Sequence, residues 1–253
     1  MRGASAGALC AIAFGLAGCV TNDVVSFNPS STQQPIVRDG VGSLVSHQPN
    51  STVMMRPAGR GVAPGERPVY VIAVQNRSAK PVNLHVADIQ VVQTKQGRWA
   101  RALPIKTYEQ LLQEEQTRQV IGAIAVGLGA AANSYSASQA GYGSVTTHTP
   151  YGTYRSTYYS PAAQQVALAN ASIQNSHNIS AFADRAEANM AALETEVLKD
   201  NTVMPGEWIG GTVTFEAPRK EHAEGAVKTY SIAVKVGEET HVIEAIQAPP
   251  AKV

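Results

Sequence analysis

The sequence has little cysteine. Its 253 residues include 2 cysteines, Cys10 and Cys19, and both lie close to the first residue. The chain beyond Cys19 therefore holds no disulfide and offers no thiolate ligands for a structural zinc site. We expect its fold to rest on the burial of apolar surface alone.

Charge is also scarce, and its two signs are balanced. Charged residues make up 15% of the chain, with 20 basic and 19 acidic side chains, and no acidic residue occurs from Gln116 to Ala183. A protein that binds nucleic acid needs a basic surface to displace counterions, and electrostatic attachment to anionic lipids needs one too. We therefore expect no nucleic-acid partner.

Signatures of catalysis, metals and cofactors are missing as well. The 6 histidines show no His-x-x-x-His spacing, and no Gly-x-Ser-x-Gly occurs. The run from Gly127 to Ala132 matches Gly-x-Gly-x-x-Ala, but a dinucleotide site needs a preceding strand and an acidic residue about 20 positions later. The next acidic residue is Asp184. The sequence predicts a protein that is not an enzyme and has no cofactor or metal.

What is present begins with an export signal. Arg2 precedes an uncharged, apolar run from Ala4 to Leu16, and small residues follow it. This run is shorter than the roughly 20 residues that span a bilayer, and the pattern is typical of a cleaved signal peptide. Leu16-Ala17-Gly18-Cys19 resembles the bacterial lipobox. The resemblance implies removal of residues 1–18 and attachment of diacylglycerol and an acyl chain such as palmitate to Cys19.

Two further expectations concern the chain that follows Cys19. Val20 stands where an aspartate would favour retention at the inner membrane in enterobacterial lipoproteins. The resemblance therefore implies an outer-membrane anchor that faces the periplasm. Residues 19–50 include Asn28 to Pro35, a polar and proline-containing stretch, and we predict a flexible tether over 19–50 with one short strand at Gly42 to His47.

Residues 51–105 and 202–248 carry strand patterns. Val69 to Val74 is a compact β-branched and aromatic run, and apolar residues alternate with polar ones from Tyr230 to Val236. The alternation that starts at Val82 changes phase at Ala87-Asp88, which predicts a bulge or a change of sheet. Seven to nine short strands with turns between them predict a mainly β fold, an immunoglobulin-like antiparallel sandwich.

Residues 106–201 have helical patterns instead, and we predict an antiparallel helical hairpin inserted into the sandwich. Thr107 and Gln110 have the spacing of a capping box, and Ser160-Pro161 is typical of a helix start. Apolar residues recur in the first helix at Leu111, Leu112, Val120, Ile121, Ile124 and Leu128. In the second helix we expect inward positions at Val166, Ile173, Ile179, Phe182, Ala186, Met190 and Leu193.

The stretch from Val120 to Ala132 is uncharged and rich in Gly and Ala. Such a segment can pack through small residues against the second helix, insert partly into a membrane, or associate with a second copy. We favour packing within the chain and keep the other two interpretations open.

The segment 133–160 between the helices is rich in Tyr, Gly and Ser and holds six of the 9 tyrosines. The candidate partner contacts are Tyr142, Tyr151, Tyr154, Tyr158 and Tyr159. Exposed tyrosines can contact a protein partner or sugars, or lie at a membrane interface. A mobile polar loop with no binding role is the remaining interpretation.

The arrangement resembles a loosely defined set of uncharacterised bacterial lipoproteins. The shared motifs are the turn from Pro205 to Gly211 and the helix start Ser160-Pro161-Ala162-Ala163, and the resemblance covers about residues 65–247. It implies fold and location but no activity. Our leading hypothesis is a lipid-anchored cell-envelope protein that acts as a non-enzymatic scaffold or adaptor for another envelope component, and we expect that partner to be a protein. The alternatives are a membrane-active or self-associating oligomer through residues 120–132, and a peptidoglycan or carbohydrate-binding module.

Overall fold

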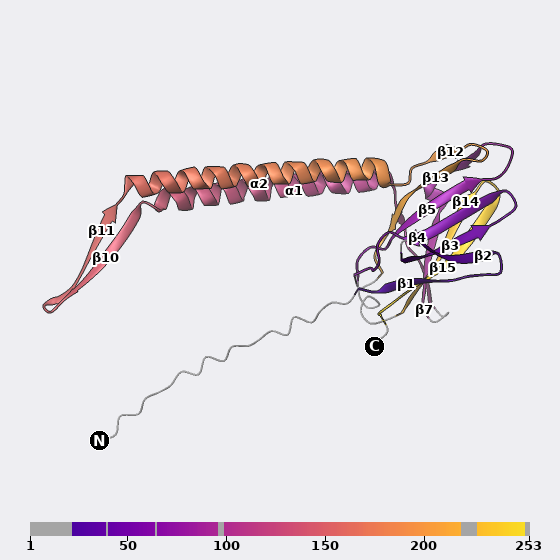
Figure 1. The fold of residues 1–253 in the computed structure, drawn as a ribbon, viewed down its shortest axis with the longest axis horizontal. Coiled ribbons are helices and arrows are strands. Elements are labelled where there is room, and N and C mark those ends of the chain that lie inside the picture. The colour runs from indigo at the N-terminus through magenta and orange to yellow at the C-terminus, as the bar shows by residue number, and fades with distance from the viewer. Residues whose placement is uncertain (1–21, 39, 64, 96–98, 219–226, 251–253) are drawn as a thin grey trace, which may run out of the picture.

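The computed structural model describes residues 22–250 except 39, 64, 96–98 and 219–226. This part of the chain is mainly β, with antiparallel sheets and two long helices (Figure 1). The mainly β class with a helical segment between two β regions is therefore confirmed. The expected signal peptide 1–18 and Cys19 lie outside the described residues.

Two large sheets contain most of the strands. The five-stranded sheet has the order β1 (Val24–Asn28), β15 (Glu239–Ala248), β14 (Lys228–Val236), β7 (Gln90–Lys95) and β8 (Trp99–Ala102). The six-stranded sheet has the order β2 (Gln33–Arg38), β3 (Val41–His47), β4 (Ser51–Pro57), β5 (Val69–Asn76), β13 (Trp208–Phe215) and β9 (Ile105–Lys106). A small sheet pairs β6 (Val82–Leu84) with β12 (Asn201–Val203). We call these three sheets the β body.

The flexible tether predicted for residues 19–50 is wrong for the described part of that range. β1 pairs with β15, and β2 pairs with β3. The second pairing includes Pro35, which lies opposite Leu44. The prediction at Gly42 to His47 was right, since β3 begins at Val41 and ends at His47. Pro35 is tolerated because β2 is the edge strand of its sheet, where a missing backbone donor costs little.

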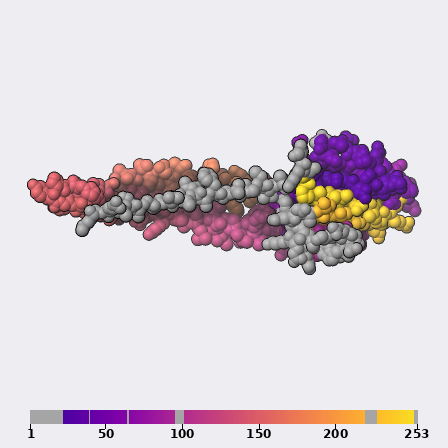
Figure 2. Space-filling model, turned by 90° about the horizontal axis from the view of Figure 1, so that it is seen from below, coloured from indigo at the N-terminus to yellow at the C-terminus, as the bar shows by residue number. Residues whose placement is uncertain are grey.

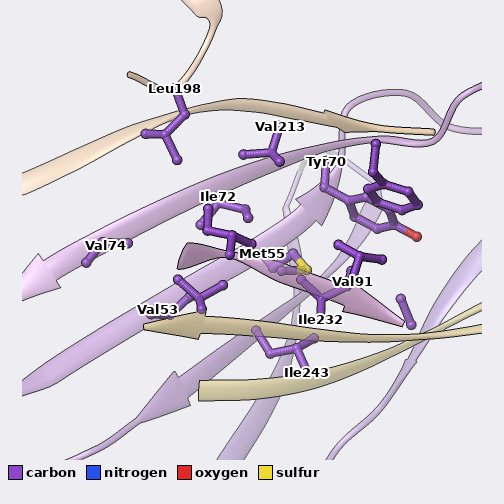
Figure 3. Close-up of a cluster of buried hydrophobic side chains, with 14 of the residues drawn as sticks. Val53, Met55, Tyr70, Ile72, Val74, Val91, Leu198, Val213, Ile232 and Ile243 are labelled. Atoms are coloured by element: carbon purple, nitrogen blue, oxygen red, sulfur yellow. The ribbon is translucent and has the colours of Figure 1, made fainter. Parts of the chain in front are cut away.

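The hydrophobic core lies between the two large sheets and takes residues from both (Figure 3). Alternate residues of β5, including Tyr70, Ile72 and Val74, are buried in this core. Alternate residues of β14, in the opposite sheet, are buried in it too. The Tyr70 ring stacks on Phe215 with centroids 5.7 Å apart. This period-two burial is what the alternation in the sequence predicted.

The phase change at Ala87-Asp88 is a change of sheet. A short 3-10 helix, Val86–Asp88, separates β6 from β7. β6 pairs with β12 in the small sheet, whereas β7 pairs with β14 and β8 in the five-stranded sheet. The chain thus moves between sheets without breaking the alternation on either side.

The two helices extend from one side of the β body (Figures 1 and 2). α1 runs over Tyr108–Gln139 (32 residues) and α2 over Pro161–Glu196 (36 residues), so each is roughly 50 Å long at 1.5 Å per residue. Both predicted starts are confirmed: Thr107 forms a capping box with Gln110, and Ser160 accepts a hydrogen bond from the Ala163 backbone N–H. At the far end, β10 (Tyr142–Thr149) pairs with β11 (Gly152–Tyr159).

Candidate functional site

The segment with the predicted contact tyrosines forms the end of the molecule most distant from the β body (Figure 1). We call β10 and β11 with their turn, residues 142–159, the tip. Most of its residues are exposed, and neither strand pairs with a described strand outside the tip. Both edges of this two-stranded sheet therefore present free backbone donors and acceptors among the described residues.

The strand register divides the tyrosines between the two faces of the tip. Residues directly opposite each other share a face, so Tyr142 and Tyr159 lie together, with ring centroids 4.9 Å apart. Arg155 is on that face and donates to the Ser144 hydroxyl at 3.2 Å. This face therefore carries mainly polar groups, and its one aromatic pair lies at the base of the tip.

The other face carries Tyr154 and Tyr158 together with Val145. Tyr158 lies over Gly143, which leaves no space for a side chain at that glycine. Tyr151 is in the turn and is 93% exposed. The structure thus brings the five predicted tyrosines to one end of the molecule but not to a single surface, and Tyr154 with Tyr158 forms the more apolar of the two faces.

Between the tip and the β body, small and polar side chains join α1 to α2. Gln119 donates to the Ala186 carbonyl at 3.2 Å, and Asn133 donates to Asn175 at 3.0 Å. Gly122 faces the Phe182 ring, where an added Cβ would lie 2.5 Å from the nearest ring carbon. The predicted role of small residues within 120–132 as packing residues is therefore met at Gly122.

Several apolar residues that we expected to face inward point outward instead. Phe182, Ala186, Met190 and Leu193 are half-buried as predicted, but Val166, Ile173 and Ile179 are more than half exposed. In α1 the exposed fractions of Val120, Ile121, Ile124 and Leu128 are 61%, 63%, 59% and 68%. The inner face uses other residues because the helices approach closely enough to require small ones.

Among the described residues, α1 is the one helix long and apolar enough to cross a membrane by length and composition. An 18-residue window of it has a mean hydropathy of 1.4, and 6% of that window is buried. The Gly127 to Ala132 motif lies inside this helix, so no strand leads into it. It lacks the strand-to-helix turn that binds a dinucleotide phosphate.

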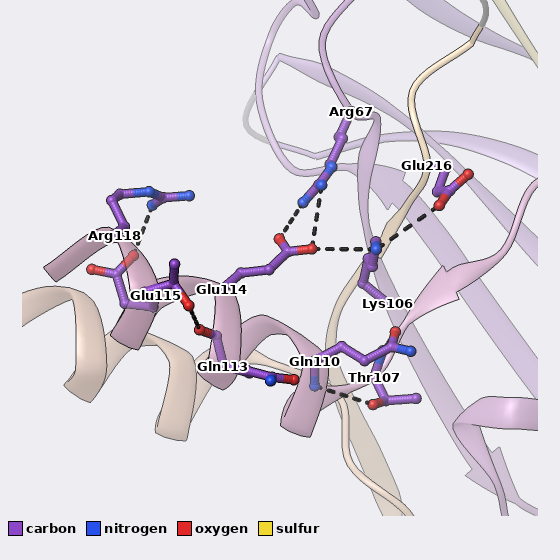
Figure 4. A network of polar contacts seen from close by, with 10 residues as sticks. Arg67, Lys106, Thr107, Gln110, Gln113, Glu114, Glu115, Arg118 and Glu216 are labelled. Atoms are coloured by element: carbon purple, nitrogen blue, oxygen red, sulfur yellow. Dashed lines mark hydrogen bonds and ion pairs between the residues drawn. The ribbon is translucent and has the colours of Figure 1, made fainter. Parts of the chain in front are cut away.

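A network of charges fixes the base of α1 to the β body (Figure 4). The Glu114 carboxylate accepts hydrogen bonds from Arg67 and lies 3.2 Å from Lys106 Nζ, which lies 3.9 Å from Glu216. The hydrogen bond from Arg67 lowers the pKa of Glu114 below its ordinary value, against a smaller opposing effect of burial. Glu115 is buried nearby and accepts from Arg118 and from Asn189 of α2.

Inside the β body, a buried polar cluster resembles catalytic machinery only in its residue types. Ser51 Oγ lies 2.8 Å from His241 Nε2 and also contacts the Glu239 carboxylate, and His241 Nδ1 lies 2.9 Å from Ser46 Oγ. Burial lowers the pKa of His241, so its imidazole is neutral at pH 7. Ser51 and His241 are 1% and 0% exposed, so no substrate reaches them. No sequence pattern indicated this cluster, because Ser51 and His241 are 190 positions apart.

A surface cavity of about 590 Å³ lies on the outer face of the six-stranded sheet. Trp208 lines it, 49% exposed, together with Gln34, Gln75, Arg38 and Arg77. Aromatic side chains beside a few polar groups are typical of small-molecule binding sites. Sequence reasoning missed this site because its residues come from separate strands.

No group of three or more His, Cys, Asp or Glu side chains that could hold a metal ion occurs within the described ranges. Comparisons of the chain with protein-family models, with curated proteins and with solved structures found no match. The structural class is thus a mainly β body that carries a long helical projection with an aromatic tip.

Proposed function

We propose that this chain is a lipid-anchored envelope protein, and that it acts as a non-enzymatic scaffold or adaptor through its tip. The observation that carries the proposal is the position of the tyrosines: Tyr154 and Tyr158 are 61% and 55% exposed at the end of helices roughly 50 Å long. Tyrosine gives a large contact area at low entropic cost, which suits recognition of a protein partner.

The proposed fold is an immunoglobulin-like sandwich interrupted by an antiparallel helical hairpin. The antiparallel pairing of both large sheets and the core shared between them support the sandwich. Contacts of Glu115 with Asn189, and of Asn133 with Asn175, support helices that run in opposite directions. In this arrangement the sandwich is the base and the hairpin carries the tip away from it.

The proposed anchor is a lipid on Cys19, with the protein held at the outer membrane and facing the periplasm. β1 begins at Val24, so about four residues would separate the lipid from the first strand, or roughly 14 Å of extended chain. The β body would then stand close to the bilayer. A single acyl chain binds membranes weakly, and several chains on one residue make the attachment stable.

The anchor would lie near the base of the helices. Asp23, next to β1, exchanges two backbone hydrogen bonds with Val62. Arg67, in the same connection between β4 and β5, binds Glu114 of α1. One connection therefore contacts both the start of β1 and the start of α1, which supports a projection that leaves the body at its membrane-proximal end.

The anchor is tested by Cys19→Ser. We expect the wild-type chain in the membrane fraction and the variant in the soluble periplasmic fraction. A Cys10→Ser variant is the matched control, because Cys10 belongs to the part that we expect to be removed. Persistence of Cys19→Ser in washed membranes would contradict the proposed anchor.

The adaptor role is tested by crosslinking in intact cells followed by purification of the chain. We expect the doubly substituted Tyr154→Ser/Tyr158→Ser chain to lose a specific crosslinked protein that the wild type captures. Tyr142→Ser/Tyr159→Ser is the control for the opposite face and should retain it. An unchanged set of crosslinked proteins in the first variant would refute binding through the tip.

One alternative gains support from a specific observation, the cavity beside Trp208. Its amide and guanidinium groups are suited to a peptidoglycan or other carbohydrate ligand. Cosedimentation with purified sacculi tests this, with Trp208→Ala as the variant. Binding that Trp208→Ala abolishes would favour the carbohydrate-binding function over the adaptor.

A further inference from the structure

The outer face of α1 has the spacing of a helix-packing seam. Ile121, Ile124, Leu128, Ala131 and Tyr135 follow each other at alternating steps of three and four residues. This alternation is the a/d pattern with which one helix packs against another in a coiled coil. We call these five residues the α1 seam. All five are exposed, with Leu128 at 68% and Tyr135 at 69%.

The α1 seam points away from α2. The positions of α1 that face α2 are also spaced by three or four residues, and they are Gln119, Gly122, Val126, Ala130 and Asn133. A helix pair that is complete in water buries its apolar stripe between the helices and exposes its polar one. In α1 the face toward α2 holds small and polar residues apart from Val126, whereas the other large apolar residues of this stretch are exposed on the opposite face. The α1 seam therefore has no partner within the described chain.

The α1 seam is better suited to packing against another helix than to insertion into a bilayer. α2 carries amide, hydroxyl or imidazole side chains throughout the half nearer the tip, among them Gln165, Asn170, Gln174 and Asn178. Hydrogen bonds such as Asn175 Nδ2 to the Ala130 carbonyl, at 3.1 Å, hold α2 to α1. Insertion of α1 into lipid would therefore bring these polar groups of α2 with it, and their desolvation is costly.

The area of the α1 seam fits a second copy. Burial of its large side chains, with Val120 beside them, would remove roughly 500 Å² of apolar surface from water, and flanking side chains along a contact some 25 Å long add more. The sum approaches the roughly 800 Å² that each partner contributes to a specific interface. A two-fold dimer uses the same surface on both partners, so an apolar seam is complementary to itself.

Charge favours the same occupant. Between Arg118 and Arg155 the chain has no Asp, Glu, Lys or Arg. Two identical surfaces that meet around a two-fold axis place like charges near each other, which would destabilise a charged seam. The uncharged α1 seam avoids this repulsion.

We propose that two copies of this chain dimerise through α1, with the α1 seam of one packed against the α1 seam of the other. The dimer forms independently of any partner at the tip, so it does not rest on the adaptor role. It would hold two tips on one assembly, which strengthens binding to a partner with two sites.

The test is the mass of the full-length chain in detergent, measured by sedimentation equilibrium over a range of concentrations. We expect a dimer, and we expect Leu128→Glu to raise its dissociation constant at least 100-fold. Ile173→Glu is the matched control, because Ile173 is 69% exposed but lies on α2. Circular dichroism should show equal helix content in all three chains, since both positions point to solvent.

A monomeric wild-type chain would overturn the proposal, as would a dimer that survives Leu128→Glu or one that Ile173→Glu dissociates. A photo-crosslinking residue gives a second readout that does not rely on destabilisation. Placed at position 128 it should yield a covalent dimer, and at position 173 it should not.

The lipid alternative is examined with vesicles of phosphatidylethanolamine and phosphatidylglycerol. We expect the Cys19→Ser chain not to float with them, because its α1 seam is covered in the dimer. Flotation that Leu128→Glu abolishes would overturn the proposal in favour of a membrane-binding helix.

Discussion

The buried ion pair between Asp23 and Lys228 is the contact whose loss we expect to cost most. Lys228 Nζ lies 2.6 Å from Asp23 Oδ2, and the two side chains are 1% and 2% exposed. Gln247 donates to the same carboxylate oxygen at 2.9 Å. The pair connects the residue before β1 with the first residue of β14, so it fixes the N-terminal strand to the centre of its sheet.

Lys228→Met keeps an unbranched side chain that is one atom shorter, and it removes the charge. The Asp23 carboxylate then stays buried with Gln247 as its remaining side-chain partner, and breaking a buried pair in this way costs about 3–5 kcal/mol of unfolding free energy. The double variant Asp23→Asn/Lys228→Met removes both charges and should cost less than the single one, about 2 kcal/mol or under. The loss of unfolding free energy in the double variant would thus be smaller than the sum of the losses in the two single variants.

Equilibrium unfolding of the Cys19→Ser chain in urea, followed by tryptophan fluorescence, measures these differences. Glu114→Gln is the control, because Glu114 and Arg67 are 31% and 41% exposed and such a pair contributes at most about 1 kcal/mol. The reasoning would be refuted if Lys228→Met lowered the free energy of unfolding by less than about 1 kcal/mol, or if the double variant were less stable than Lys228→Met.

Three further predictions concern the β body and the helices. Burial lowers the pKa of His241 below its ordinary 6.5, so the folded protein favours the neutral imidazole. The folded state is therefore most stable, as far as His241 is concerned, above pH 6.5, and it loses stability as the pH falls below 6.5. Thermal unfolding between pH 8 and pH 5 should show this decline, and a smaller one in His241→Gln. Ser160→Ala removes the N-cap of α2 and should cost about 1 kcal/mol, with faster hydrogen exchange in the first turn. Ile72→Ala opens a cavity in the core and should cost about 2–5 kcal/mol in urea unfolding.

Local signals in the sequence predicted several elements correctly. The capping residues Thr107 and Ser160 marked both helix starts, because a cap is a contact within a few residues. The phase change after Val82 predicted a bulge or a change of sheet, and the structure shows the change of sheet at the 3-10 helix. Edge strands gave weaker signals, and β2 was missed because Pro35 and the polar residues around it indicate a loop.

Features that depend on distant residues could not be predicted. The Asp23–Lys228 pair joins positions 205 apart, and nothing near either residue indicates the other. Helical periodicity identified the apolar face of α1, but period alone does not say which face meets α2. The small residues Gly122 and Ala130 decided that question, because they allow close approach while Ile124 and Leu128 do not.

The central claim, a chain anchored by lipid on Cys19, is tested most directly by the intact mass of the protein purified from membranes. We predict a chain that begins at Cys19, lacks residues 1–18, and carries the added mass of diacylglycerol and an acyl chain. A chain that retains residues 1–18, or one that begins at another residue and carries an unmodified thiol at Cys19, would contradict the claim.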